Sequence, residues 1–243
     1  MSAPDRCEPA QRLFLAVPCY GQPSRECMLS IIAAHEAMRQ AGGVVDLAVL
    51  PGCCYIDHAR NQLATEFLEG GCSDILFVDA DIQFDLEALT KIVMATRPVV
   101  AGIYRKKTDE AMTWPVRFGE GEHTMVDGLL EATHVPTGFL RINRAALEHL
   151  VAEGHAPRYG NGHGGRKWRR FFRCNYEQDP LGEPGDLEYW GEDYQFSRDC
   201  TAAGLKLWTI PDMTLGHVGE KVYEGNWAEW MVSQGAAKKR EAA

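Results

Sequence analysis

Apolar residues gather into short runs of strand length in the first hundred residues. Residues 13–19 and 44–50 are two such runs, and each is followed by turn residues. Residues 74–79 form a continuous apolar run that ends in a carboxylate, a pattern typical of a strand buried on both faces. Residues 99–104 form a fourth run after a proline. We therefore expect four strands in this half of the chain.

Between these runs the apolar residues change to helical spacing. They recur every three or four residues over 28–38 and over 59–68, and glycine pairs follow both segments. Asp57 and Asp85 stand where they could cap the second and third helices. Alternating strands and helices with short connections predict an α/β fold, an open, mostly parallel twisted sheet with helices on both faces. Ligands of such sheets bind beyond the carboxyl ends of the strands.

The second half of the chain is less regular. Residues 131–143 resemble a strand that enters a helix, and residues 154–185 are rich in glycine, which predicts a mobile loop. A helix that ends at Gly204 and a short strand over 205–210 follow.

Composition indicates one ordinary globular domain. The chain has 243 residues, of which 45% are hydrophobic and 24% charged. No apolar stretch approaches the roughly 20 residues that span a bilayer. Residues 1–12 are polar and lack the apolar middle of a signal peptide, so we expect a disordered lead-in and a cytoplasmic protein without a membrane span. The 8 cysteines include no Cys-x-x-Cys pair and are expected to be reduced, mostly buried thiols.

The carboxylates Asp79 and Asp81 are the sharpest chemical feature. They follow a buried strand one residue apart, where both can face a pocket, bind a hard divalent cation and leave positions open for phosphate oxygens. The alternative is a solvated acidic turn in which Asp81 or Asp85 only caps a helix.

Three further features have two interpretations each. Glu192 and Asp193 open a helix, where they suit the helix dipole or supply a general base. His217 stands between two glycines after a strand and is either structural or completes a carboxylate site for a cation such as manganese. Arg60 and Asn61, near the start of the second helix, could hold part of a nucleotide or form a structural ion pair.

Taken in order along the chain, these elements resemble the glycosyltransferase A fold, which is Rossmann-like, and within it the inverting family-2-like enzymes, including small transferases of phages and large viruses. The resemblance extends over residues 13–225. The matching segments are residues 17–20, 59–61, 77–81, 100–107, 137–144, 192–196 and 216–217. Arg105 departs from the Tyr-Pro that often precedes the basic pair of this family.

The resemblance implies a role for each matching position. The nucleotide-sugar donor would be held by Pro18, Cys19, Tyr20, Arg60, Asn61, Asp79, Ala80, Asp81, Lys107, Thr137, Gly138 and Phe139. Asp79 would hold the ribose or a metal-bound water. Manganese or magnesium would be bound by Asp79, Asp81 and His217, and Asp193, with Glu192 beside it, would be the catalytic base.

The resemblance also implies which part of the chain binds the donor and which the acceptor. Residues 13–110 would form the nucleotide-sugar half of one domain and residues 130–225 the acceptor half, with 226–243 as a tail or helix. The donor would be a UDP- or GDP-linked hexose or pentose. The acceptor is left open among a glycan, a lipid, a protein and a modified DNA base. A viral protein of this kind would act in the host cytoplasm.

A basic segment over 158–173 contrasts with the net charge of −9. The overall charge argues against nucleic-acid binding by the whole surface, so such binding is expected only through this segment. Aromatic residues alternate with its arginines, which suits an anionic acceptor such as modified DNA or a lid over the donor diphosphate. The alternative is a surface loop whose aromatic side chains pack beneath it.

Two other function classes compete with a transferase. A nucleotidyltransferase would use a related sheet, but it usually has a glycine-rich basic loop after the first strand, and residues 17–23 lack one. A non-catalytic module that binds a sugar or nucleotide would retain the fold, and intact Asp79, Asp81, Asp193 and His217 argue against it.

Overall fold

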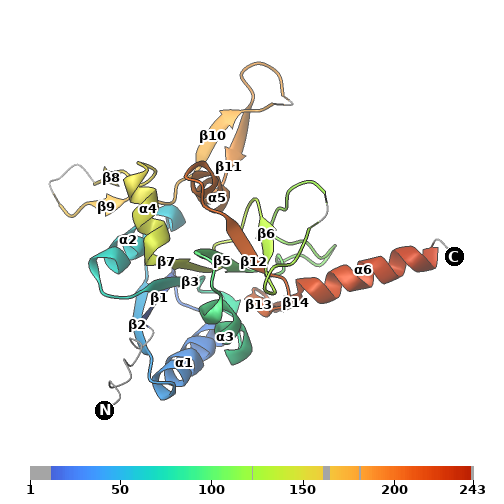
Figure 1. Ribbon diagram of the computed structural model, residues 1–243, viewed down its shortest axis with the longest axis horizontal. Helices are drawn as coiled ribbons and strands as arrows, with labels where there is room; N and C mark the ends of the chain where they lie inside the picture. The colour runs from blue at the N-terminus through green and yellow to red at the C-terminus, as the bar shows by residue number, and fades with distance from the viewer. Residues whose placement is uncertain (1–11, 122, 161–164, 181, 242–243) are drawn as a thin grey trace, which may run out of the picture.

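The computed structural model describes residues 12–121, 123–160, 165–180 and 182–241. Its largest sheet has seven strands (Figure 1). The strands and helices of the first half form where the sequence pattern predicts them. They are β1 (Arg12–Pro18), α1 (Arg25–Gln40), β2 (Val44–Leu50), α2 (Ile56–Glu69), β3 (Asp74–Val78), α3 (Leu86–Met94) and β5 (Val99–Gly102). The expected lead-in falls outside the described residues, except that Arg12 already belongs to β1.

One of the two expected helix caps is present. The side chain of Asp85 accepts a hydrogen bond from Ala88 N at the start of α3, as predicted. Asp57 does not cap α2, because the helix begins at Ile56 and its N-cap is Tyr55. Asp57 lies in the first turn instead and accepts a hydrogen bond from His58 N. The apolar spacing indicated the helix but not its first turn.

Strand β4 (Ile82–Gln83) and the elements of the second half complete the fold. Among the latter are β6 (Leu130–Ala132), β7 (Phe139–Asn143), α4 (Arg144–Ala152), α5 (Glu192–Ala202), β12 (Leu207–Ile210), β13 (Thr214–Val218), β14 (Val222–Asn226) and α6 (Trp227–Glu241). The strand over 131–143 is thus two strands, β6 and β7, of which β7 leads directly into α4. Strands β14, β13 and β4 form a separate three-stranded sheet. Helix α6 extends away from the sheet (Figure 1), and its Trp227 packs on Phe118.

The central sheet has the order β2-β1-β3-β7-β5-β12-β6. Strand β1 is parallel to β2 and β3, and β12 is parallel to β5. Strand β7 lies antiparallel between β3 and β5, and β6 is antiparallel to β12 at the edge. All strands except β6 and β7 therefore share one direction, which confirms the open, mostly parallel sheet.

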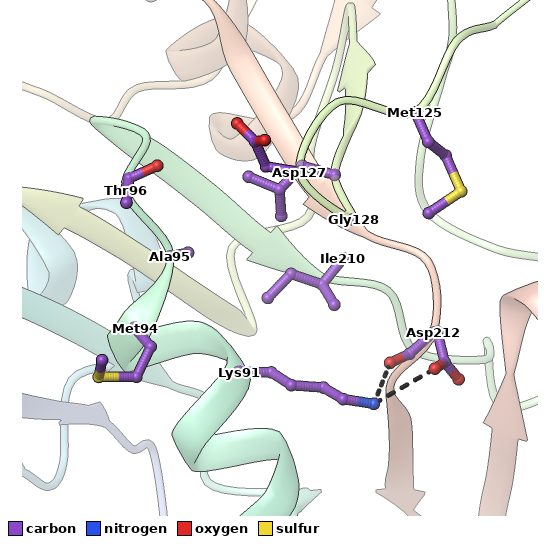
Figure 2. A pocket seen from close by; sticks show the side chains of 10 residues that line it. Lys91, Met94, Ala95, Thr96, Met125, Asp127, Gly128, Ile210 and Asp212 are labelled. Atoms are coloured by element: carbon purple, nitrogen blue, oxygen red, sulfur yellow. Dashed lines mark hydrogen bonds and ion pairs between the residues drawn. The ribbon is translucent and has the colours of Figure 1, made fainter.

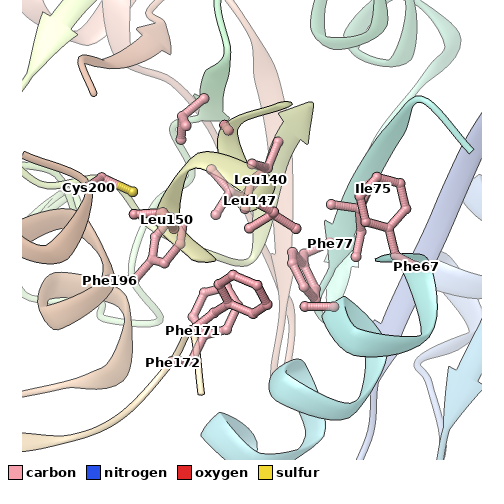
Figure 3. Close-up of a cluster of buried hydrophobic side chains, with 14 of the residues drawn as sticks. Phe67, Ile75, Phe77, Leu140, Leu147, Leu150, Phe171, Phe172, Phe196 and Cys200 are labelled. Atoms are coloured by element: carbon pink, nitrogen blue, oxygen red, sulfur yellow. The ribbon is translucent and has the colours of Figure 1, made fainter. Parts of the chain in front are cut away.

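Helices cover both faces of the sheet. On one face α2, α4 and α5 enclose a core in which Phe172 lies edge-on to Phe77 and stacks on Phe196, with ring centroids 5.3 and 4.6 Å apart (Figure 3). On the other face α1 and α3 pack Ile31 and Leu89 against the sheet. The alternation of strand side chains between these two cores explains why the central strand β3 is buried along its whole length.

The segment over 154–185 is not the irregular loop that its composition predicts. Its described residues contain the antiparallel pair of β8 (Arg158–Tyr159) with β9 (Trp168–Arg169). They also contain β10 (Asn175–Gln178), which pairs antiparallel with β11 (Leu187–Trp190) just beyond the segment. Between these pairs Phe171 and Phe172 are buried in the core. The β10–β11 hairpin extends away from the sheet (Figure 1). Glycine content indicated turns, whereas local antiparallel pairing and burial of the two phenylalanines organise the segment.

The cysteines that the structure describes are free thiols, and Cys19, Cys27, Cys72 and Cys200 are buried. Cys7 lies outside the described residues. Among the described helices, none combines the length and apolar composition that a bilayer crossing requires.

Candidate functional site

A pocket of about 420 Å³ opens at the carboxyl ends of β1 and β3. This is the edge of the sheet where the sequence pattern placed a ligand site. Its wall contains most of the strand-end residues that we predicted. The lining residues are Pro18, Cys19, Tyr20, Gly21, Gln22, Ser24, Ile56, Asp79, Ala80, Asp81, Val218 and Gly219. Tyr20 is 75% exposed, so its ring is available to a ligand.

Backbone hydrogen bonds fix the turn that carries the two aspartates. Asp79 N donates to Gly138 O at 2.9 Å and Ser24 N donates to Ala80 O at 2.8 Å. Val218 N donates to Asp81 O at 2.7 Å. The turn is thus tied to β7, to the start of α1 and to β13, and its two carboxylates have defined positions at the pocket.

Pairing of β13 with β4 brings His217 to Asp81. Strand β4 follows the aspartate turn directly, and His217 lies opposite Ile82 in the antiparallel register. His217 Nε2 is 3.5 Å from Asp81 Oδ2. His217 Nδ1 lies 3.0 Å from the carbonyl oxygen of Arg105, which can only accept a hydrogen bond, so Nδ1 carries a proton. A protonated ring would donate Nε2–H to this carboxylate, whereas a neutral ring would turn the Nε2 lone pair toward it, an arrangement that a cation between the two would stabilise.

The neighbours of Asp81 hold its carboxylate in the ionised form. Lys107 Nζ lies 2.5 Å from Asp81 Oδ2. Burial opposes ionisation of Asp81, but the hydrogen bonds with His217 and Lys107 outweigh it and lower its pKa to about 2. A carboxylate with this pKa is charged at neutral pH and suits binding of a hard cation.

Arg60 lies beneath the pocket rather than in its wall. Its side chain is 2% exposed, and Nη2 is 2.8 Å from Asp79 Oδ1. Arg60 Nε is also 3.5 Å from Glu192 Oε1, so one buried guanidinium faces carboxylates from β3 and α5. Asn61 is buried too, and its amide exchanges two hydrogen bonds of 2.8 Å with the backbone of Phe172. These contacts give both side chains a structural role, and a role beside the nucleotide stays a prediction.

Because Asp79 faces Arg60, the three expected metal ligands do not form one cluster. Among the residues that the structure describes, no group of three histidine, cysteine or acidic side chains is close enough to hold a metal ion. Asp81 and His217 still form a pair whose carboxylate suits manganese or magnesium and whose imidazole favours manganese of the two. These two residues therefore fit a cation, and the other ligands would have to come from the donor or solvent.

Glu192 and Asp193 begin α5 close to Arg60. Burial raises the pKa of Glu192, and Arg60 opposes this rise. Burial likewise raises the pKa of Asp193, although its Oδ1 accepts a hydrogen bond of 2.7 Å from Tyr194 N. A carboxylate with a raised pKa binds a proton more readily than an ordinary one, as a general base must.

The segment Thr137-Gly138-Phe139 packs against Asp79, with Thr137 and Phe139 buried in the protein. Thr137 is 2% exposed, and Phe139 is buried against Phe84 in the core. A Cβ at Gly138 would lie 2.7 Å from Tyr104 Oη and 2.9 Å from Asp79 Oδ2, so only glycine fits there. Tyr104 was not among the predicted site residues. Its position at the end of an apolar run was visible in the sequence, but its contact with Gly138 and its ring contact with His217 were not.

A second pocket, of about 450 Å³, lies between the end of α3 and residues 125–129 (Figure 2). Its charged side chains have charged partners, Asp212 for Lys91 and, from outside the wall, Arg97 for Asp127. Lys91 Nζ donates to Asp212 O at 2.7 Å, and Asp127 pairs with Arg97 at 3.1 Å. The rest of the wall is largely apolar, including Met94. None of the predicted site residues lines this pocket.

Comparison with solved structures identifies the fold. The structure of A197 from STIV superimposes with a TM-score of 0.51 at 18% identity, covering 86% of this chain and 86% of that one. The structure of GalNAc-T7 with UDP, GalNAc and Mn²⁺ gives a TM-score of 0.50 at 12% identity, covering 87% of this chain and 44% of that one. No family model and no curated protein matches the chain. The chain has the glycosyltransferase A fold.

Proposed function

We propose that this protein is a glycosyltransferase that moves a sugar from a nucleoside-diphosphate sugar to an acceptor hydroxyl, with inversion at the anomeric carbon. The observation that carries the proposal is the approach of His217 to Asp81, which lines the pocket at the carboxyl ends of β1 and β3. The fold supports it, since the GalNAc-T7 structure with the same fold holds UDP, GalNAc and Mn²⁺.

The donor would enter along the strand-end wall of the pocket. Pro18, Cys19 and the exposed ring of Tyr20 would contact the nucleoside. Asp79 would hold the ribose or a metal-bound water, in keeping with its place in the same wall. Lys107 would reach the diphosphate, because its ammonium group already lies beside Asp81.

Asp81 and His217 would hold manganese or magnesium. A bound divalent cation would neutralise the charge that develops on the departing nucleoside diphosphate. The backbone bonds of the aspartate turn and the bond between His217 and Arg105 O keep both side chains in place for this role.

Asp193 would act as the general base. It would take the proton of the acceptor hydroxyl while the hydroxyl oxygen attacks the anomeric carbon, and the bond to the diphosphate would break on the opposite face. Glu192 is the less suitable base of the two, because its carboxylate faces the guanidinium of Arg60. We assign Glu192 the role of holding the start of α5 through that ion pair.

The test is a panel of UDP- and GDP-linked sugars with manganese, in which released nucleoside diphosphate is measured. We expect release with at least one donor, and loss of release in Asp193→Asn while nucleotide binding persists. Glu131→Gln serves as a control, since Glu131 is an exposed carboxylate paired only with Lys206 in the described contacts. Normal turnover by Asp193→Asn would remove Asp193 from the mechanism.

A further inference from the structure

The ammonium group of Lys107 contacts Asp81, a carboxylate in the wall of the proposed donor pocket. Lys107 Nζ lies 2.5 Å from Asp81 Oδ2, and His217 Nε2 approaches the same oxygen at 3.5 Å. A divalent cation that bound Asp81 and His217 would need the space and the oxygen that the ammonium group now uses. Two cations this close would also repel one another. Lys107 and a divalent cation held between Asp81 and His217 therefore compete for Asp81 Oδ2 in this arrangement.

The surrounding backbone is shaped to admit the lysine. A Cβ at Gly219 would lie 3.1 Å from Lys107 Cδ, so the absence of a side chain at Gly219 leaves room for the lysine stem. The chain is held on both sides of Lys107, because Lys106 N donates to Thr113 O and Arg105 Nη2 donates to Thr108 O, each at 2.8 Å. The Lys107 side chain itself is 32% exposed, so it can leave Asp81 without opening the core.

We propose that Lys107 is a built-in counter-ion that competes with the divalent cation for Asp81. In the free protein the ammonium group neutralises Asp81 and weakens cation binding. When a nucleoside diphosphate binds, its phosphate oxygens offer the ammonium group another partner, and Asp81 becomes available to the cation. This inference rests on the proposed function, because the cation and the diphosphate come with it.

Cooperative binding follows from this competition. The cation and the nucleotide both favour the arrangement in which Lys107 has left Asp81, so each must raise the affinity for the other by the same factor. A lysine that formed only a static surface ion pair would produce no such coupling through its own side chain.

The experiment is a titration of the free protein with Mn²⁺, followed by the electron paramagnetic resonance signal of unbound Mn²⁺. We expect Lys107→Met to bind Mn²⁺ about two- to fivefold more tightly than the wild type, the factor typical of a partly exposed ion pair. Lys107→Gln should behave in the same way. Lys106→Met is the matched control, which removes a neighbouring lysine charge, and should match the wild type. Addition of UDP or GDP should tighten Mn²⁺ binding more in the wild type than in Lys107→Met.

Unchanged or weaker Mn²⁺ binding in both Lys107 variants, with Asp81→Asn weakening it, would overturn the role of Lys107 and leave the proposed cation site standing. Absence of Mn²⁺ binding in the wild type and in every variant, with and without UDP or GDP, would overturn the proposed function together with this inference. Circular dichroism of each variant checks that it is folded.

Discussion

The guanidinium of Arg60 lies 2.8 Å from Asp79 Oδ1 beneath the pocket floor, and it faces Glu192 on its other side. A buried cation thus links the strand that carries the aspartate turn to the helix that carries the proposed base. The pair is more than a surface ion pair, because the Arg60 side chain is almost fully enclosed.

Replacement of Arg60 by methionine should destabilise the fold. The change would leave Asp79 and Glu192 without their buried counter-charge, and we expect a loss of about 3–5 kcal/mol in the free energy of unfolding. Urea denaturation measures it. Arg166→Met is the control, since Arg166 forms an exposed pair with Glu69 and its loss should cost less than about 1 kcal/mol. Equal effects of the two changes would contradict the account.

Gly138→Ala should damage the site with a single methyl group. The added Cβ would meet Tyr104 Oη and Asp79 Oδ2 at less than contact distance, and we expect a loss of about 1–3 kcal/mol of stability together with weaker binding of UDP or GDP. Gly119→Ala is the matched control, because its nearest neighbour would lie 3.9 Å away. Thermal unfolding with and without nucleotide measures both effects. A fully functional Gly138→Ala protein would show that the turn tolerates displacement.

Asp193→Asn should separate stability from activity. Because burial raises the pKa of Asp193, the native state holds a proton at this group more readily than the unfolded state does. The group therefore favours folding below its unfolded pKa, and this contribution is lost as the pH rises through the folded value. At neutral pH the neutral amide should match or exceed the wild type in stability while kcat falls about 10²- to 10⁴-fold.

The raised pKa of Asp193 also predicts how turnover depends on pH. The acidic limb of kcat/KM should lie above the ordinary aspartate pKa of 3.8, because the base must lose a proton that burial helps to retain. An Asp193→Asn protein that is strongly destabilised at pH 7, or that keeps the acidic limb, would contradict this assignment.

His134 should make the fold sensitive to mild acid. Burial, with help from Arg117 and Arg198, lowers its pKa from 6.5 to about 4. Between these two values the unfolded state binds more protons, so stability is full above pH 6.5 and is lost as the pH falls toward 4. Because the His134 ring is only partly enclosed, we expect the free energy of unfolding to fall by about 1–2 kcal/mol over this pH window. His134→Gln should lose less stability between pH 7 and pH 4.5 than the wild type, and denaturation at both pH values tests this.

The sequence predicted those parts of the site that depend on local pattern. Apolar runs and helical spacing located β1, β2 and β3, and the position of Asp79 and Asp81 after a buried run located the pocket edge. These features can be predicted locally, because the few residues that form a strand also determine which residues follow its end.

Contacts between distant segments could not be predicted in this way. Nothing local indicates that β13 pairs with β4, and this pairing brings His217 to Asp81; the resemblance to a known fold supplied that expectation. Burial of Arg60 under Asp79, and of Phe172 against Phe77, likewise depends on which elements pack together. The arginines and aromatic residues over 158–173 left open a ligand-binding loop or a surface loop with aromatic side chains packed beneath it. Phe171 and Phe172 fill the core, as the second alternative expects.

The central claim is that one pocket binds a nucleoside diphosphate together with a divalent cation on Asp81 and His217. Isothermal titration of UDP and GDP into the wild type, Asp81→Asn and His217→Asn, each with and without Mn²⁺, tests it most directly. We predict that Mn²⁺ strengthens binding of at least one nucleotide in the wild type by tenfold or more, on the order of 1.4 kcal/mol, and has no effect in either variant. Nucleotide affinity that is absent, or equal in all three proteins with and without Mn²⁺, would contradict the account.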